Sequence, residues 1–275
     1  MNSLDINLYN SASTEASKSA LIEVLRTLSS YSDYFVLGGG WAPYYIIEHF
    51  SQNTQFQHCG SIDIDLFMHP DLRGTSQYAT IVEILSTRGF NQADNRRFPF
   101  RFDKTIISHV NNQSYDIHLD FITEPPDIML QEDLIAAGIR GCSISLDHFF
   151  IHPVRGIFPG NGIVTVDARV CNVLGCLVTK GLAMKGRFKE KDPYDVYAVI
   201  TNYKNGPRDV AKEFKENLTN PIIIEALEAI KEQFISERSE GPYSVARFMS
   251  PGDQSMQSRV RTDAFMSVNE FLTNL

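Results

Sequence analysis

Several features that would place the chain in a specialised class are missing from its sequence. None of the four cysteines among its 275 residues lies in a C-x-x-C pair, so we expect neither a zinc knuckle nor a disulfide framework. No apolar run approaches the roughly 20 residues that a membrane-spanning helix needs. The first residues, MNSLDINLYN, have no basic region followed by an apolar one. These absences predict a soluble, cytoplasmic globular protein with no membrane partner.

Charge is distributed unevenly along the chain. The formal net charge is −8, and residues 1–179 account for all of it, whereas residues 180–275 carry equal numbers of basic and acidic side chains. An acidic chain is not expected to be coated in nucleic acid. Basic residues nevertheless form two local clusters, which are either solvated faces or contacts for phosphate: Arg96, Arg97, Arg101 and Lys104, and Lys180, Lys185, Arg187, Lys189 and Lys191.

The spacing of apolar residues changes near Asp167. Before this point, short apolar runs alternate with helical stretches, which predicts helices at 12–29, 41–50 and 76–88 and strands at 34–37, 61–67, 98–103, 105–110 and 114–122. After it, the pattern predicts helices at 169–187, 193–203, 208–217, 221–238 and 257–273, with breaks at Asn205-Gly206-Pro207, Asn220-Pro221 and Gly241-Pro242. Pro193 in a first helical turn makes Asp192 the expected N-cap. The sequence therefore predicts an α+β protein whose sheet is followed by a helical bundle.

Two aspartates alternate with isoleucines in the segment Ser61-Ile62-Asp63-Ile64-Asp65. On a strand, Asp63 and Asp65 point to one face and the isoleucines to the other. Carboxylates that converge to about 4 Å repel each other by about 4 kcal/mol at an effective dielectric constant of about 20. A divalent cation offsets this repulsion, and Mg²⁺ commonly takes one or two protein carboxylates together with substrate phosphates. The alternative is the polar face of an edge strand.

A second predicted strand, SYDIHLDFIT, carries further acids on one face, at Asp116 and Asp120, with His118 between them. We expect Asp120 to complete a triad with Asp63 and Asp65, because the apolar strand continues beyond it, and we keep Asp116 as the alternative. In two-metal chemistry, the third acid can also accept the proton of the attacking hydroxyl. His118 is expected to be a hydrogen-bonded neighbour.

Three consecutive glycines, Gly38, Gly39 and Gly40, separate the predicted strand YFVL from the helical stretch WAPYYIIEHF. Glycine lets the backbone approach an anion closely, and the amides and dipole at the start of a helix stabilise negative charge. The turn therefore suits a phosphate group, although a simple tight turn explains the same residues.

Together these motifs resemble the nucleotidyltransferase superfamily of DNA polymerase beta type, whose mark is a strand, a glycine turn, a helix and a strand with D-x-D. The chain resembles most closely the AbiEii-type nucleotidyltransferases, the toxins of bacterial toxin–antitoxin and phage-defence pairs. Residues 180–187, KGLAMKGR, match that family's K-x-x-A-x-x-x-R helix, and residues 191–195, KDPYD, match its basic-D-x-x-D motif. The matching motifs span about residues 34–200.

The resemblance implies transfer of a nucleoside monophosphate from an NTP to an acceptor hydroxyl, with Mg²⁺ or Mn²⁺ as the metal. It implies a nucleotidyltransferase-fold mixed sheet with flanking helices in residues 1–167 and a C-terminal helical bundle in residues 168–275 that completes the cleft. A tRNA end is the expected acceptor and a cognate antitoxin the expected partner. The implied site residues fall into three groups: Asp63, Asp65 and Asp120 on metal; Gly38, Gly39, Gly40, Ser61, Lys180 and Arg187 at the nucleotide; and Lys180 and Asp195 in catalysis, with Asp192 or Asp195 positioning Lys180 and Arg187.

Two departures from the family pattern leave other readings open. His58-Cys59-Gly60 replaces the basic residue that usually precedes S-x-D-x-D, and the segment SQNTQFQ lengthens the connection to Asp63. The string GGGWA is also similar to aminoglycoside and lincosamide nucleotidyltransferases, so an antibiotic or a protein side chain is an alternative acceptor. A degenerate domain that only binds a nucleotide or a protein partner is a further alternative, and the intact acidic triad argues against it.

Overall fold

The computed structural model describes residues 6–72, 75–92, 100–124, 137–160, 162–187 and 189–275. The chain forms two compact units. The sheet unit comprises Asn10–Ala42 and Gly60–Cys171, and the helical unit comprises Met1–Tyr9, Pro43–Cys59 and Asn172–Leu275. The sequence-based division falls between residues 167 and 168, whereas the long segment of the helical unit begins at Asn172. Among the described residues, no helix combines the length and the apolar character that crossing a bilayer requires.

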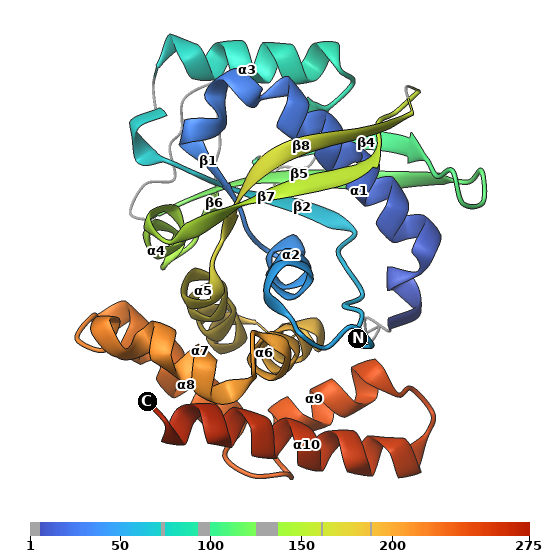
Figure 1. The fold of residues 1–275 in the computed structure, drawn as a ribbon. Coiled ribbons are helices and arrows are strands. Elements are labelled where there is room, and N and C mark those ends of the chain that lie inside the picture. Colours follow the sequence, from blue (N-terminus) through green and yellow to red (C-terminus); the bar gives the residue numbers. More distant parts are fainter. Residues whose placement is uncertain (1–5, 73–74, 93–99, 125–136, 161, 188) are drawn as a thin grey trace. The chain divides into compact units, whose positions relative to one another are not determined.

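The strands described for the sheet unit form one mixed sheet in the order β3-β4-β5-β2-β1-β8-β7, with β6 beside β5 (Figure 1). β2 runs parallel to β5, whereas β4 and β5, and β7 and β8, are antiparallel. The strands are β1 (Phe35–Leu37), β2 (Asp63–Met68), β3 (Asn91–Gln92), β4 (Arg101–Ile107), β5 (Ser114–Thr123), β6 (Ala137–Gly138), β7 (Phe149–Ile157) and β8 (Ile163–Cys171). This mixed sheet and the helices around it confirm the α+β prediction.

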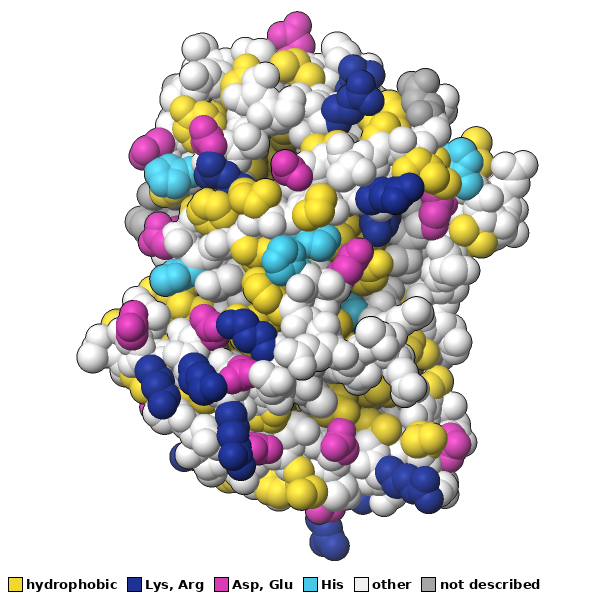
Figure 2. Space-filling view, viewed as in Figure 1, with side chains coloured by type: hydrophobic (Ala, Val, Ile, Leu, Met, Phe, Trp, Pro, Cys, Tyr) yellow, Lys and Arg dark blue, Asp and Glu magenta, His cyan; other side chains and the backbone are white. Residues whose placement is uncertain are grey.

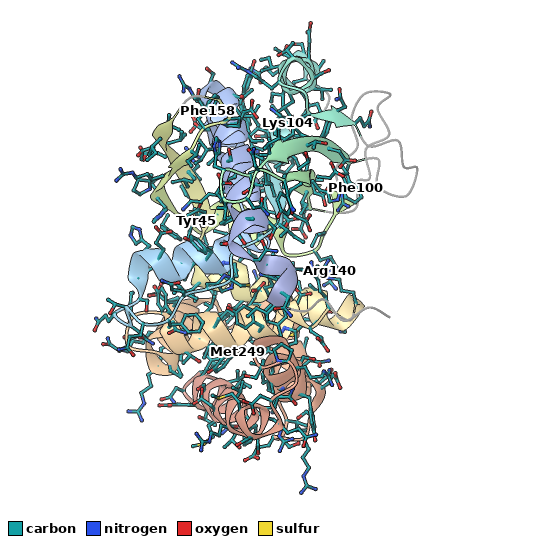
Figure 3. The ribbon with its side chains drawn as sticks, turned by 90° about the vertical axis from the view of Figure 1, so that its right-hand side faces the viewer. Tyr45, Phe100, Lys104, Arg140, Phe158 and Met249 are labelled. Atoms are coloured by element: carbon teal, nitrogen blue, oxygen red, sulfur yellow. The ribbon has the colours of Figure 1, made fainter. Side chains whose placement is uncertain are left out.

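Helices α1 (Ser11–Thr27) and α3 (Ser76–Thr87) lie over one face of the sheet, and α4 (Cys142–Asp147) follows β6 in the chain (Figure 1). α1 begins at Asn10, whose side-chain oxygen accepts hydrogen bonds from the amides of Ala12 and Ser13, each at 3.0 Å. The apolar residues that alternate along β2 and β5 are buried. On β4, Lys104 lies beside α1 (Figure 3) and pairs with the buried Glu23 of that helix. Because successive side chains of a strand point to opposite faces, the polar residues between the apolar ones of β2 and β5 lie on the other face of the sheet.

The helical unit contains α5 (Val173–Gly186), α6 (Lys191–Asn202), α7 (Pro207–Phe214), α8 (Pro221–Gln233), α9 (Glu240–Met249) and α10 (Gln254–Thr273). α2 (Trp41–Phe50) begins with two residues of the sheet unit and continues in the helical unit. Proline occupies the first position of α7 and of α8, where a missing N–H costs no helical hydrogen bond. Basic and acidic side chains are interspersed over the visible face of this unit (Figure 2), and residues 180–275, which make up most of it, carry equal numbers of the two. Short 3₁₀ helices lie at Ile6–Tyr9, Ser29–Tyr34, Pro70–Leu72 and Lys215–Asn217.

The structure corrects the predicted strands of the sheet unit. The strands expected at 98–103 and 105–110 are the single strand β4, and residues 98–99 lie outside the described residues. The hairpin of β7 and β8 was not predicted. Because β8 continues to Cys171, the helix expected from residue 169 begins only at Val173.

A break was also misplaced in the helical unit. Gly241 and Pro242, the expected break, lie in the first turn of α9. Proline disrupts a helix in its interior but is tolerated in the first turn, because the amides there have no helical acceptor. Gly241 and Pro242 therefore lie at the start of a helix and not at a break between helices.

All four cysteines have free thiols. Cys142, Cys171 and Cys176 are buried and Cys59 is half-buried. The absence of a disulfide framework among them was predicted.

Candidate functional site

The two aspartates of the D-x-D motif lie on β2 with the alternation that the sequence predicted. Ile64 and Leu66 are buried, whereas Asp63 and Asp65 are half-buried on the opposite face of the strand. In the parallel pairing of β2 with β5, Asp65 is the direct neighbour of Asp120. Since adjacent strands lie about 4.8 Å apart, the three carboxylates belong to one patch of the sheet.

Asp116, the alternative third carboxylate, lies farther along β5. The first residue of β2, Asp63, is paired with His118, so Asp116 lies beyond the end of β2. It is exposed, and the Thr105 hydroxyl donates a hydrogen bond to its Oδ1 at 2.7 Å. The strand register therefore favours Asp120 over Asp116 as the neighbour of the D-x-D pair.

Arg101 of β4 occupies the position directly opposite Asp120. Its Nε donates to Asp120 Oδ1 at 2.8 Å and its Nη2 donates to Oδ2 at 2.7 Å, which makes the pair bidentate. The hydrogen bonds to Asp120 raise the pKa of Arg101 above its ordinary value, and the charge of Asp63 acts in the same direction. Asp63 is thus within electrostatic reach of the guanidinium.

The sequence placed Arg101 only within a basic cluster, expected to be a solvated face or a contact for phosphate, and gave it no acidic partner. The alternation in Arg101-Phe102-Asp103 could have indicated that Arg101 shares the polar face, but it could not indicate which strand lies beside β4. Asp103 pairs in the same way, with its Oδ1 2.6 Å from Nδ1 of His118. Arg96 and Arg97 of the same cluster lie outside the described residues.

The glycine turn packs against β2. Gly39 has a φ of +54°, and a Cβ built on it would lie 1.6 Å from Oδ2 of Asp65. The amide of Gly38 donates to the carbonyl oxygen of Asp65 at 2.9 Å, and a Cβ on Gly38 would lie 2.3 Å from the ring of Phe67. Gly40 completes the turn before α2. Only glycine leaves room at position 39 for the carboxylate of Asp65.

Ser61 lies two residues before the start of β2 and is hydrogen-bonded to its first residue. Its hydroxyl donates to the backbone carbonyl of Asp63 at 2.9 Å, and the side chain is buried. The preceding Gly60 has a φ of +77°, and a Cβ there would lie 2.4 Å from the methyl group of Thr14 on α1. A contact between Ser61 and a triphosphate stays a prediction.

The donor set suits a hard divalent cation. Asp63 and Asp65 supply carboxylate oxygens, which Mg²⁺ and Mn²⁺ prefer, and Gly39 keeps clear the space in which Asp65 lies. Within the described ranges, no group of three or more His, Cys, Asp or Glu side chains is arranged to hold a metal ion by itself. Both oxygens of Asp120 are engaged by Arg101. The residues fit a cation held by two carboxylates and completed by oxygens of a substrate.

In the helical unit, the two family-like motifs of α5 and α6 form one buried ionic network. Nζ of Lys180 lies 2.9 Å from Asp192 Oδ1 and 2.6 Å from Asp195 Oδ2. Lys191 Nζ lies 2.7 Å from Asp195 Oδ1, and Arg187 Nε lies 3.1 Å from Asp192 Oδ2. The Arg187 side chain is 55% exposed, whereas that of Lys180 is 9% exposed. Lys180 thus binds both aspartates, and Arg187 remains the more accessible cation.

Asp192 is not the N-cap that the sequence predicted. α6 begins at Lys191, with Glu190 at the N-cap position, and Asp192 is the second residue of the helix. Its buried carboxylate accepts hydrogen bonds from Lys180 and Arg187. Pairing with these two cations offsets the burial of its charge, which capping of a backbone amide would do less completely.

The network shifts the pKa values of Lys180 and Asp195 in the directions that keep both groups charged. Burial alone would lower the pKa of Lys180, but the neighbouring Asp192 and Asp195 outweigh that effect and raise it. Burial would likewise raise the pKa of Asp195, but Lys180 and Lys191 lower it well below its usual range. Both groups are therefore charged at neutral pH.

His58 belongs to the same network, a role that sequence reasoning missed. Its Nε2 lies 3.0 Å from Asp195 Oδ1, and its ring stacks on Tyr194 with the centroids 5.1 Å apart. Burial lowers the pKa of His58 to about 4, even though the hydrogen bond to Asp195 opposes the change. The neutral ring therefore donates its Nε2–H to the carboxylate. The only sequence signal was that His58 belongs to the segment His58-Cys59-Gly60, which replaces the basic residue expected from the resemblance.

The chain matches no family model, and no curated protein matches it. Among solved structures, the crystal structure of JHP933 from Helicobacter pylori is similar, with 12% sequence identity and a TM-score of 0.45 over 96% of this chain and 94% of that chain. At this level of similarity, the comparison supports no conclusion about function.

Proposed function

We propose that the chain is a metal-dependent nucleotidyltransferase of the AbiEii type, which transfers a nucleoside monophosphate from an NTP to an acceptor hydroxyl. The observation that carries the proposal is the contact between the Asp65 carboxylate and Gly39 of the strand, turn and helix. A glycine turn at the start of a helix suits phosphate, and paired aspartates suit a hard cation. A metal-bound triphosphate needs both elements in one place.

Each candidate site residue of the sheet unit has a role in this proposal. Asp63 and Asp65 would hold the metal, which would neutralise the charge that develops on the phosphate oxygens. The amides of Gly39 and Gly40 would donate to the triphosphate, with Ser61 beside them. Asp120 keeps lone pairs that can accept a hydrogen bond from the attacking hydroxyl and so orient it.

The proposal also extends to the helical unit. Lys180 and Asp195 are assigned to catalysis and Arg187 to the nucleotide by the family-like motifs. The greater exposure of Arg187 supports it as the side chain that meets a phosphate, while Lys180 keeps the two aspartates in place. We propose a positioning role for His58 through its hydrogen bond to Asp195.

The acceptor and the biological setting are proposed from the resemblance alone. A tRNA end is the proposed acceptor, a cognate antitoxin the proposed partner, and phage defence or toxicity the proposed context. An antibiotic, a protein side chain and mere nucleotide binding are the competing outcomes of the experiment below.

The test is incubation of the purified chain with Mg²⁺, α-labelled NTPs and, separately, total RNA, cell protein or an aminoglycoside panel. We expect label in RNA, and we expect Asp63→Asn and Asp65→Asn to abolish transfer while the circular dichroism spectrum is unchanged. Asp116→Asn is the matched control, because it makes the same change on the same face of the sheet beyond the end of β2. Full activity in either D-x-D variant would contradict the proposal. An absence of Mg²⁺-dependent NTP binding in titration calorimetry would favour the degenerate domain.

A further inference from the structure

The third carboxylate of the site is already bound by a cation of the chain itself. The guanidinium of Arg101 donates to both oxygens of Asp120, at 2.8 and 2.7 Å. A divalent ion at Asp120 would have to share an oxygen with this guanidinium and would lie next to its positive charge. Two cations that close repel each other strongly, all the more at a half-buried site.

The backbone fixes the arginine in this position. Arg101 and Asp120 are direct partners in the antiparallel pairing of β4 with β5, so their side chains leave adjacent strands on the same face. The next pair on this face, Asp103 and His118, is also joined side chain to side chain. The arginine is one member of a series of cross-strand pairs, not a surface residue that happens to reach an acid.

We propose that Arg101 takes the place of one of the two divalent cations of nucleotidyl transfer, so that the chain binds a single ion, at Asp63 and Asp65. The inference rests on the proposed function, because it concerns the metal of the same site. Arg101 then has two tasks: it holds Asp120 in position, and it supplies a permanent positive charge at Asp120, where the second ion would otherwise bind.

The test counts bound ions rather than activity. Mn²⁺ serves as the probe because it uses the same hard oxygen ligands as Mg²⁺. It is titrated into the purified chain, and the free ion is measured by electron paramagnetic resonance. We expect one ion per chain for the wild type and two for Arg101→Gln, which releases Asp120. The double variant Arg101→Gln/Asp120→Asn should return to one ion. Arg169→Gln, which removes an arginine of β8 that pairs with Asp33, is the matched control and should stay at one.

The outcomes separate the two proposals. Two ions in the wild type, or one ion in a folded Arg101→Gln variant, would overturn the role of Arg101 and leave the nucleotidyltransferase proposal intact. An absence of bound Mn²⁺ in the wild type would overturn both. If Arg101→Gln does not fold, the wild-type count still decides, and Arg101→Lys, which keeps the positive charge, should bind one ion.

Discussion

At the scale of single residues, the protonation of His58 follows from opposing effects in its surroundings. Burial lowers its pKa, the hydrogen bond to Asp195 raises it, and the charges of Lys191 and Lys180 lower it further. The pKa is about 4 in the folded chain, compared with about 6.5 for an unperturbed histidine. The folded state therefore keeps the ring neutral at pH values at which the unfolded chain binds a proton.

We predict that the free energy of unfolding decreases as the pH falls from about 6.5 towards about 4, because unfolding is accompanied by proton uptake at His58. The contribution is complete above the unfolded pKa and is lost progressively below it. His58→Gln keeps an N–H donor for Asp195 and removes the titrating group. Urea denaturation should show a difference between about pH 7 and about pH 5 that is smaller in the variant by about 2 kcal/mol. An identical pH dependence in both proteins would contradict this account.

At the scale of elements, α5 and α8 touch through a glycine. A Cβ on Gly181 would lie 2.6 Å from the backbone carbonyl oxygen of Ala226. That oxygen belongs to the backbone of α8 and cannot turn away as a flexible side chain would. α5 carries Lys180, so this close approach also helps to hold the residue that pairs with α6.

We therefore predict opposite effects for the same substitution at two positions of α5. Gly181→Ala should destabilise the chain by about 1–3 kcal/mol, because the two helices must separate. At Gly186, nothing lies within 4 Å of an added Cβ, so Gly186→Ala should be neutral or stabilising by up to about 1 kcal/mol through helix propensity. Thermal or urea unfolding of the two variants measures the difference. Equal free energies of unfolding for the two variants would show that α5 and α8 can separate to admit the added Cβ without destabilising the chain.

At the scale of the whole molecule, the net charge of −8 and the carboxylate patch of the sheet unit both favour the binding of cations. An ion that binds the folded chain and not the unfolded one stabilises the fold by mass action. The three carboxylates of the site repel one another, and a bound ion also relieves that repulsion.

We predict that Mg²⁺ at about 100 times its Kd raises the free energy of unfolding by about 2.7 kcal/mol. The double variant Asp63→Asn/Asp65→Asn should lose this increase. NaCl at equal ionic strength serves as the control for screening of the net charge. If Mg²⁺ stabilised the double variant as much as the wild type, the ion would bind elsewhere on the chain.

Local pattern was sufficient for much of the fold. The alternation of Asp63 and Asp65 with aliphatic residues predicted the faces of β2, and the helical periodicity from residue 41 to 50 matched α2. Periodicity reports which side of an element is buried, because that property depends only on neighbours in sequence. It did not separate the end of β8 from the start of α5, where both elements are apolar.

The contacts that define the candidate site were decided by tertiary structure. Arg101 meets Asp120 because β4 and β5 pair in one register, and Asp65 covers Gly39 because β2 returns beside β1. His58 and Asp195 are 137 residues apart in sequence and yet share a hydrogen bond. The sequence alone determined which residue types were present and on which face of an element they lie. Only the packing of strands and helices decided which of these side chains became neighbours, since that depends on the free energy of the whole core and not on any local pattern.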